Sequence, residues 1–346
     1  MTDRLITDAF RTPRGWDSGH LQTIRNRVVP RTYDLGAVSK QRSTLIDLAD
    51  GTGDELVVQL HTSRQRRVGD ARGGLVVLIH GLGGTAESVY VRASAHGLLS
   101  VGFNVARVDL RGVGLSGRTS ALFYHAGRTD DLRAVLSALA TEPEASDNPT
   151  GEPRLAIMGF SLGGNMTIKL MGEPHDQVPV FGAVAISAPL DLTVGAVHLR
   201  RIGFGVYEKV LLAGLKRQAM EPGPRGSVRV SPQERTAIHH ARTLAEFDDA
   251  FTAPRNGWKD SAEYYAVNSS NQFLPKIDAP TLVIHSVDDP MVPAEPYRDV
   301  DWTAVERGGF VQRRVTARGG HVGFHERGAL LPWYVGQAAE FLSVAD

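Results

Sequence analysis

LAIMGFSLGGNMTIK, residues 155–169, is the stretch that decides the fold of this chain. It contains the pattern Gly-x-Ser-x-Gly at Gly159, Ser161 and Gly163. Residues 154–159 have the length and apolar character of a buried strand, and residues 162–171 continue as a helix. This context predicts that the serine lies on a strained turn, where any larger side chain at the glycines would collide with the neighbouring strand or helix. We therefore predict that Ser161 is a nucleophile rather than an incidental serine in a glycine-rich turn.

The order of segments around this turn predicts a mostly parallel central sheet with helices on both faces, the α/β-hydrolase fold. Strands are expected at residues 44–48, 55–61, 75–80, 105–110, 154–159, 180–187, 281–286 and 310–316, the first two as a hairpin. Helices are expected at residues 130–140 and 162–171 and near residues 331–343.

The alternation of strands and helices stops between residues 190 and 273, where Pro- and Gly-rich pieces such as EPGP appear. We interpret residues 190–273 as an inserted cap that lines an acyl pocket. Residues 43–189 and 274–346 then form the hydrolase core. Residues 1–42 are expected to be an N-terminal extension that packs on this core.

The base for a serine nucleophile should be a histidine late in the chain, because this fold orders its triad as Ser, acid, His. His321 lies in GGHVG, between the last predicted strand and the last helix, and is the predicted base. His325 is the nearest rival. The two histidines have the spacing of zinc ligands on a helix, but Gly323 lies between them and no HExxH occurs, so no metal is expected.

The acid of the triad should follow the penultimate strand and hold the imidazole in one tautomer. Residues 287–290 read VDDP and contain two candidates. Asp289 lies three residues after the small residue Ser286, the usual position of this acid, and is predicted. Asp288 remains an alternative.

Backbone N–H groups should stabilise the oxyanion of the tetrahedral intermediate. One donor is the residue after the nucleophile, Leu162. The other is expected in HGLGG, residues 80–84, at Leu82, although a plain tight turn would explain these glycines too.

A second pattern, His125 followed by Asp130, has the HxxxxD spacing associated with acyltransferases. Asp130 is also explained as an acid in the first turn of a helix. The role of the pair is left open.

Composition limits the function further. The chain has 346 residues, with 38 basic and 38 acidic side chains and no cysteine. This balance argues against a nucleic-acid-binding surface, and the lack of cysteine excludes disulfides and thiolate catalysis. Residues 1–10 have no signal-peptide core, and no apolar run reaches the roughly 18–20 residues that span a bilayer. We expect a cytoplasmic protein without a cofactor or a membrane anchor; the oligomeric state is left open.

Several segments together resemble the YheT-like branch of the α/β-hydrolases, which includes animal abhydrolase-domain lipid hydrolases and yeast ethyl-ester synthases and esterases. The segments are GHLQTI at 19–24, YHAG at 124–127, GFSLGGN at 159–165, EFDD at 246–249, FTAP at 251–254, DSAEYY at 260–265 and GHVGF at 320–324. The resemblance implies a carboxylesterase, in which Ser161, Asp289 and His321 match the family's triad. Animal members carry an N-terminal membrane anchor, so their lipid substrates do not follow from the resemblance.

Three functions are compatible with these residues. The first is hydrolysis of small carboxylic esters with short- to medium-chain acyl groups through an acyl-enzyme on Ser161. The second is acyl transfer from the same intermediate to an alcohol. The third is a catalytically silent binding protein, against which an intact triad argues, because binding alone needs no nucleophile, acid and base together.

Overall fold

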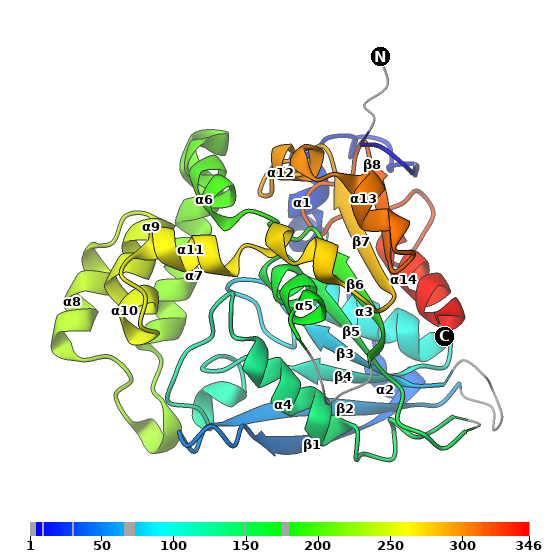
Figure 1. Ribbon diagram of the computed structural model, residues 1–346, viewed down its shortest axis with the longest axis horizontal. Coiled ribbons are helices and arrows are strands. Elements are labelled where there is room, and N and C mark those ends of the chain that lie inside the picture. The colour runs from blue at the N-terminus through cyan, green and yellow to red at the C-terminus, as the bar shows by residue number, and fades with distance from the viewer. Residues whose placement is uncertain are drawn as a thin grey trace.

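The computed structural model describes residues 5–8, 10–29, 31–65, 73–148, 150–174 and 180–345. Its centre is an eight-stranded sheet with the order β1-β2-β4-β3-β5-β6-β7-β8 (Figure 1). Strand β2 pairs antiparallel with β1 and β4. The other pairs are parallel. The predicted fold class is confirmed.

Each predicted strand is present, with shifted ends. The strands are β1 Ser39–Asp47, β2 Glu55–Ser63, β3 Leu75–Ile79, β4 Asn104–Val108, β5 Leu155–Phe160, β6 Val180–Ile186, β7 Thr281–Ser286 and β8 Val311–Thr316. The largest shift is at β1, which begins at Ser39, within the range expected for the N-terminal extension. This edge strand is mostly exposed and polar, so its first half lacks the apolar signal of a buried strand.

Helices cover both faces of the sheet. The α-helices are α1 Gly19–Val28, α2 Leu35–Val38, α3 Val89–Ser100, α4 Thr129–Leu139, α5 Leu162–Gly172, α6 Leu192–Arg201, α7 Val206–Met220, α8 Pro232–His240, α9 Leu244–Phe247, α10 Ala253–Arg255, α11 Ser261–Asn268, α12 Glu295–Asp299, α13 Trp302–Arg307 and α14 Trp333–Val344. Short 3₁₀ turns are η1 Ser116–Arg118, η2 Ile202–Gly205, η3 Pro224–Gly226, η5 Ser270–Gln272 and η6 Leu274–Lys276, and a π-helical turn, η4, spans Asp248–Thr252.

Alternate residues of the central strands belong to two separate apolar cores. In β3, Leu75, Val77 and Ile79 join the core under α4 and α5. The intervening Val76 and Leu78 join the core under α3 and α14. A sheet covered on both faces needs apolar side chains in both directions, which explains the continuous apolar runs of its strands.

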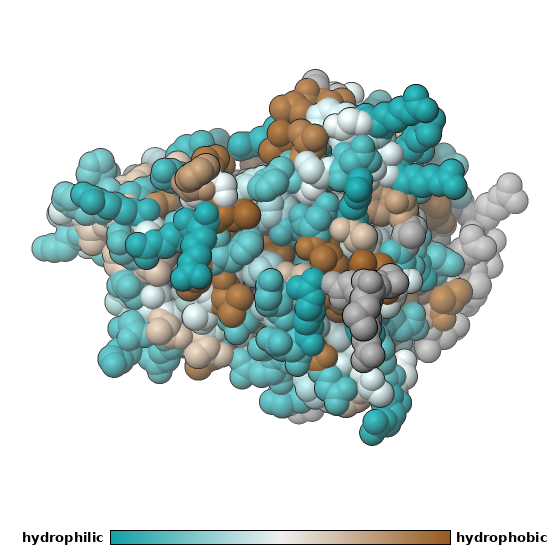
Figure 2. All heavy atoms as spheres, turned by 90° about the horizontal axis from the view of Figure 1, so that it is seen from above, coloured by the Kyte–Doolittle hydropathy of each residue, from teal (hydrophilic) through white to brown (hydrophobic). Residues whose placement is uncertain are grey.

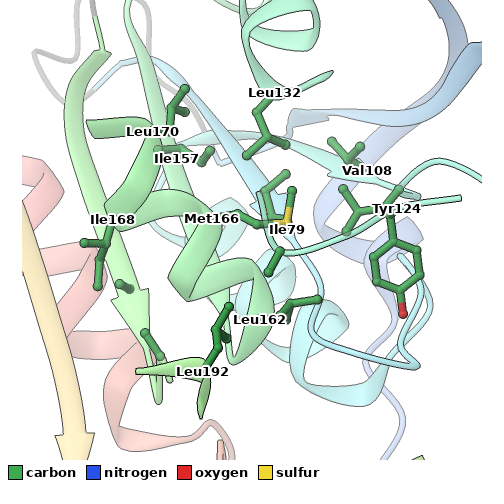
Figure 3. Packing of buried hydrophobic residues seen from close by; sticks show 14 of the residues in the cluster. Ile79, Val108, Tyr124, Leu132, Ile157, Leu162, Met166, Ile168, Leu170 and Leu192 are labelled. Atoms are coloured by element: carbon green, nitrogen blue, oxygen red, sulfur yellow. The ribbon is translucent and has the colours of Figure 1, made fainter. Parts of the chain in front are cut away.

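The helix after the nucleophile is fixed tightly against the sheet. Figure 3 shows Leu162, Met166 and Ile168 of α5 among the core side chains that include Ile157 of β5 and Leu132 of α4. Full burial of an aliphatic side chain of this size contributes about 1.5–3 kcal/mol. This packing holds the N-terminus of α5 rigidly beside the sheet.

Between β6 and β7 the described chain is helical and contains no strand. The green-to-yellow group of α7, α8, α9, α10 and α11 extends to one side of the sheet in Figure 1. We propose that residues 190–273 act as the cap.

The outer surface is of mixed polarity. Figure 2 shows a largely hydrophilic face with separate hydrophobic patches. Within the described ranges, no helix combines the length and the apolar character needed to cross a bilayer.

Candidate active site

Ser161 lies between β5 and α5 in a strained backbone conformation. Its φ is 53° and its ψ is −118°, a region that residues other than glycine rarely adopt. The Ser161 N–H donates to the carbonyl of Ile186 in β6 at 2.8 Å. A Cβ at Gly81 would lie 2.9 Å from the Cβ of Ser161, and one at Gly159 would overlap the Gly163 carbonyl. The absence of side chains at these glycines is therefore what permits the turn.

The structure brings the three predicted catalytic side chains together. Ser161 follows β5, Asp289 follows β7, and His321 lies in the loop between β8 and α14. His321 Nε2 lies 2.9 Å from Ser161 Oγ. On the other side of the ring, His321 Nδ1 lies 2.9 Å from Asp289 Oδ2. When Nδ1–H donates to the carboxylate, Nε2 is left as the acceptor for the serine proton.

Asp289 is held in its ionised form. Its side chain is fully buried, and burial alone would raise its pKa. The interaction with His321 and the N–H of Val292 outweigh burial, so the Asp289 pKa lies below its usual value. Asp289 Oδ1 accepts the N–H groups of Met291 at 2.8 Å and Val292 at 2.9 Å. The carboxylate is thus fixed in position as well as in charge.

The neighbouring acid, Asp288, has a different partner. Its Oδ1 accepts the N–H of Gly320 at 2.9 Å. Burial raises its pKa, against the opposing effect of this hydrogen bond. Asp288 therefore supports the backbone of the loop that carries His321, and the structure places Asp289 at the imidazole.

Helix α1 also supports the loop that carries His321. This contact was not predicted from the sequence. Thr23 Oγ1 accepts the His321 N–H at 2.8 Å and donates to the Gly19 carbonyl at 2.7 Å. Gln22 Oε1 accepts the N–H of His325 at 2.7 Å. The only available signal was the GHLQTI segment, which carries both Gln22 and Thr23.

His325, the rival base, is not brought to Ser161. Its ring is buried without a hydrogen-bond partner among the described residues. Burial lowers its pKa to about 3. Because this neutral imidazole is enclosed and forms no hydrogen bond with Ser161, it cannot accept the serine proton.

The turn after β3 lies beside the serine, since a Cβ at Gly81 would be 2.9 Å from the Cβ of Ser161. The Gly81 N–H donates to Tyr90 OH at 3.0 Å, and the Gly83 N–H donates to Tyr124 OH at 2.8 Å. The N–H of Leu82 between them has no such acceptor in the described part of the chain. Leu162 is the first residue of α5, so its N–H also lacks an intrahelical acceptor. Both leucines line the cavity that contains Ser161. Their role as oxyanion donors stays a prediction.

A cavity of about 440 Å³ opens over Ser161 and His321. Its walls come mainly from helices between β6 and β7 and are largely apolar. The apolar side chains from these helices are Leu192, Ala196, Leu199, Val206, Val210, Leu211, Leu215, Leu244 and Phe247. This volume and lining are typical of a site for a small organic ligand.

His125 and Asp130 do not form a catalytic pair. His125 is buried against Trp258 with ring centroids 4.9 Å apart, and burial lowers its pKa well below the usual value. Asp130 has a side chain that is 98% exposed, in the first turn of α4. The first residue is therefore a packed core histidine and the second a helix N-terminal acid.

No group of three or more His, Cys, Asp or Glu side chains that could hold a metal ion occurs among the residues that the structure describes.

The Hydrolase_4 family model, described as "Serine aminopeptidase, S33", matches residues 70–326. YheT of Escherichia coli (strain K12), which bears the name of an esterase, is 30% identical over 320 residues, or 90% of this chain and 85% of YheT. A monoacylglycerol lipase of Saccharomyces cerevisiae is 27% identical over 78% of this chain, which spans 59% of the yeast protein.

Solved structures share the fold at lower identity. An esterase of Pyrococcus furiosus superposes with a TM-score of 0.56 at 16% identity, covering 100% of this chain and 99% of that chain. The family match and the YheT relationship confirm the resemblance found in the sequence motifs. The chain belongs to the Hydrolase_4 family, in its YheT-like branch, and is an enzyme of the esterase and lipase type of α/β-hydrolase.

Proposed function

We propose that this enzyme is a serine esterase that hydrolyses small carboxylic esters with short- to medium-chain acyl groups. The observation that carries the proposal is the hydrogen-bonded series from Asp289 through His321 to Ser161 Oγ, with 2.9 Å at each step. The series ends at an apolar cavity, where an acyl chain can be buried.

Acylation begins when His321 Nε2 takes the hydroxyl proton of Ser161. The Oγ attacks the ester carbonyl carbon, and Asp289 stabilises the imidazolium that forms. The negative oxygen of the tetrahedral intermediate accepts hydrogen bonds from the N–H groups of Leu82 and Leu162. His321 then returns the proton to the alkoxide leaving group, and the alcohol departs.

Deacylation repeats these steps with water as the nucleophile. His321 removes a proton from the water, which attacks the acyl carbon on Ser161. Collapse of the second intermediate returns the proton to Ser161 Oγ and releases the carboxylic acid.

The apolar cavity wall supports an acyl chain rather than a peptide as its occupant. Transfer of each methylene from water to such a wall is worth about 0.8 kcal/mol. We expect kcat/KM to rise with acyl length until the chain fills the cavity and to fall beyond that length.

The test compares Ser161→Ala with the wild type on p-nitrophenyl butyrate. We expect a loss of at least about 10³-fold in kcat, with unchanged circular dichroism. Ser43→Ala, at an exposed position of β1, is the matched control and should keep wild-type activity. More than a tenth of the activity in Ser161→Ala would reject this nucleophile. Failure of the wild type to react with a fluorophosphonate would favour a silent binding protein instead.

A further inference from the structure

The wall of the active-site cavity contains one carboxylate, Asp248, among the described residues that line it. Asp248 begins the π-helical turn Asp248–Thr252, which lies between α9 and α10. Such turns are rare and frequently occur at functional sites. The triad does not use this carboxylate, so its presence in an apolar wall needs another explanation.

Two hydroxyl groups from the same region hold the carboxylate. Tyr265 OH donates to Asp248 Oδ2 at 2.6 Å. The hydroxyl of Thr252, one helical turn along η4, also interacts with the Asp248 carboxyl group and lowers its pKa. Both residues line the cavity as well. The three side chains therefore form one polar patch, which we call the Asp248 subsite.

No cation neutralises the carboxylate in the part of the chain that the structure describes. Burial raises the Asp248 pKa to about 6, against the opposing effect of the two hydroxyls. A carboxylate in such surroundings destabilises the fold relative to a neutral side chain of the same shape. The fold itself does not require a charged group at this position, because the amide oxygen of an asparagine would accept hydrogen bonds from the same two hydroxyls.

The Asp248 carboxylate can accept further hydrogen bonds. An ionised carboxyl group offers about four lone-pair positions, and the two hydroxyls occupy only part of them. Asp248 is half-buried and lines the cavity. A ligand in the cavity can therefore donate a hydrogen bond to it.

The Asp248 subsite and the reaction centre line the same cavity, because Asp248 lines it together with Ser161 and His321. Burial chiefly raises the pKa of Tyr124, and the negative charge of Asp248 raises it further. Tyr124 OH in turn accepts the N–H of Gly83, next to the proposed oxyanion donor Leu82. A substrate bound at Ser161 can thus reach the subsite with another of its groups.

We propose that Asp248, with Tyr265 and Thr252, binds a hydroxyl group of the substrate, so that the enzyme prefers hydroxylated esters. This inference rests on the proposed esterase function. A hydroxyl group fits the subsite because it donates a hydrogen bond without bringing a second charge into an apolar cavity. Hydrogen bonds to charged groups are among the stronger ones, which makes the preference measurable.

The experiment uses ester pairs that differ only by replacement of methyl with hydroxyl. On the acyl side, p-nitrophenyl 6-hydroxyhexanoate is compared with p-nitrophenyl heptanoate. On the alcohol side, 2,3-dihydroxypropyl hexanoate is compared with 2-methylbutyl hexanoate. The readout is the ratio of kcat/KM within each pair, which cancels general losses of activity. We expect at least one ratio to favour the hydroxyl and to fall about tenfold in Asp248→Asn.

Asp249→Asn is the matched control, because Asp249 is the exposed neighbouring acid and does not line the cavity. It should keep the wild-type ratio. Tyr265→Phe, which removes a hydroxyl that holds Asp248, should lower the ratio by a smaller factor.

Failure of the subsite proposal and failure of the esterase proposal would give different results. A wild-type enzyme that hydrolyses the plain esters without preferring the hydroxyl in either pair would overturn the subsite and leave the esterase proposal standing. An enzyme that hydrolyses no ester would overturn the proposed function itself. Preference for p-nitrophenyl 6-aminohexanoate over the 6-hydroxy ester would reject the hydroxyl in favour of an ammonium group.

Discussion

The hydroxyl of Thr23 accepts the backbone N–H of His321 at 2.8 Å, although 298 positions separate the two residues. The same hydroxyl donates to the Gly19 carbonyl within α1. An amino-terminal helix thus holds the loop that carries the proposed catalytic base.

Replacement of this hydroxyl should weaken catalysis through His321. In Thr23→Val the His321 N–H loses its acceptor, a change that costs about 1–3 kcal/mol for a buried group. We expect kcat on p-nitrophenyl butyrate to fall about tenfold with little change in KM. Thr23→Ser keeps the hydroxyl and should restore most of the rate. Equal activities for the Val and Ser variants would show that the hydroxyl is dispensable.

The two adjacent acids should respond very differently to the same substitution. Asp289→Asn removes the negative charge beside the imidazolium and disturbs its tautomer, so kcat should fall about 10³- to 10⁴-fold. Asp288→Asn keeps an oxygen that can accept the Gly320 N–H and should lose no more than a few-fold. Steady-state kinetics of both variants on one ester would decide between them. A comparable loss in Asp288→Asn would count against Asp289 as the triad acid.

Asp248 should make the stability of the fold depend on pH. Its pKa is raised from 3.8 to about 6, so the folded state holds this proton more tightly than the unfolded chain does. The contribution of this residue to stability therefore decreases as pH rises from about 4 to about 6 and stays low above that range. Asp248→Asn removes the penalty, which amounts to at most about 3 kcal/mol at pH 7.5 and nearly vanishes at pH 3.5.

Urea unfolding of both proteins at pH 3.5 and pH 7.5 measures this difference. The Asn variant should gain stability relative to the wild type only at the higher pH. An equal difference at both values would contradict the raised pKa.

The hydroxyl of Tyr124 should help to position the turn that carries the proposed oxyanion donor Leu82. In Tyr124→Phe the Gly83 N–H loses its acceptor, so the adjacent Leu82 N–H is held less firmly. We expect kcat to fall roughly 5- to 30-fold, equivalent to about 1–2 kcal/mol, with a smaller change in KM. Tyr33→Phe removes a hydroxyl that bonds the Leu330 carbonyl outside the cavity and is the matched control. A rise in KM with unchanged kcat would assign Tyr124 to substrate binding instead.

The central part of the sheet could be predicted from sequence because its strands are buried on both faces and therefore read as continuous apolar runs, as in β3. Helix α3 was missed for the opposite reason. Its buried positions include Ala93, Ser94 and Gly97, which produce little apolar periodicity.

The candidate site was predictable where its residues follow strands in a fixed order. Ser161, Asp289 and His321 each lie in a loop at the carboxyl end of a strand or just beyond it. The spacing from Ser286 favoured Asp289 over Asp288, and the structure places the Asp289 carboxyl group at the imidazole. Spacing does not encode the partner of Asp288, whose carboxyl group accepts the N–H of Gly320. The Asp248 subsite depends on contacts between η4 and α11, so no local pattern could reveal it.

The contact between α1 and the His321 loop has a practical consequence for constructing shortened forms of the enzyme. A fragment trimmed to the span matched by the family model, residues 70–326, would omit α1, α2, β1, β2 and α14. It would retain all three proposed triad residues and still lose the Thr23 hydroxyl that anchors the His321 loop, two sheet strands and the covering helix α14. Expression boundaries for this enzyme should therefore be chosen from its hydrogen bonds and not from the extent of its sequence match.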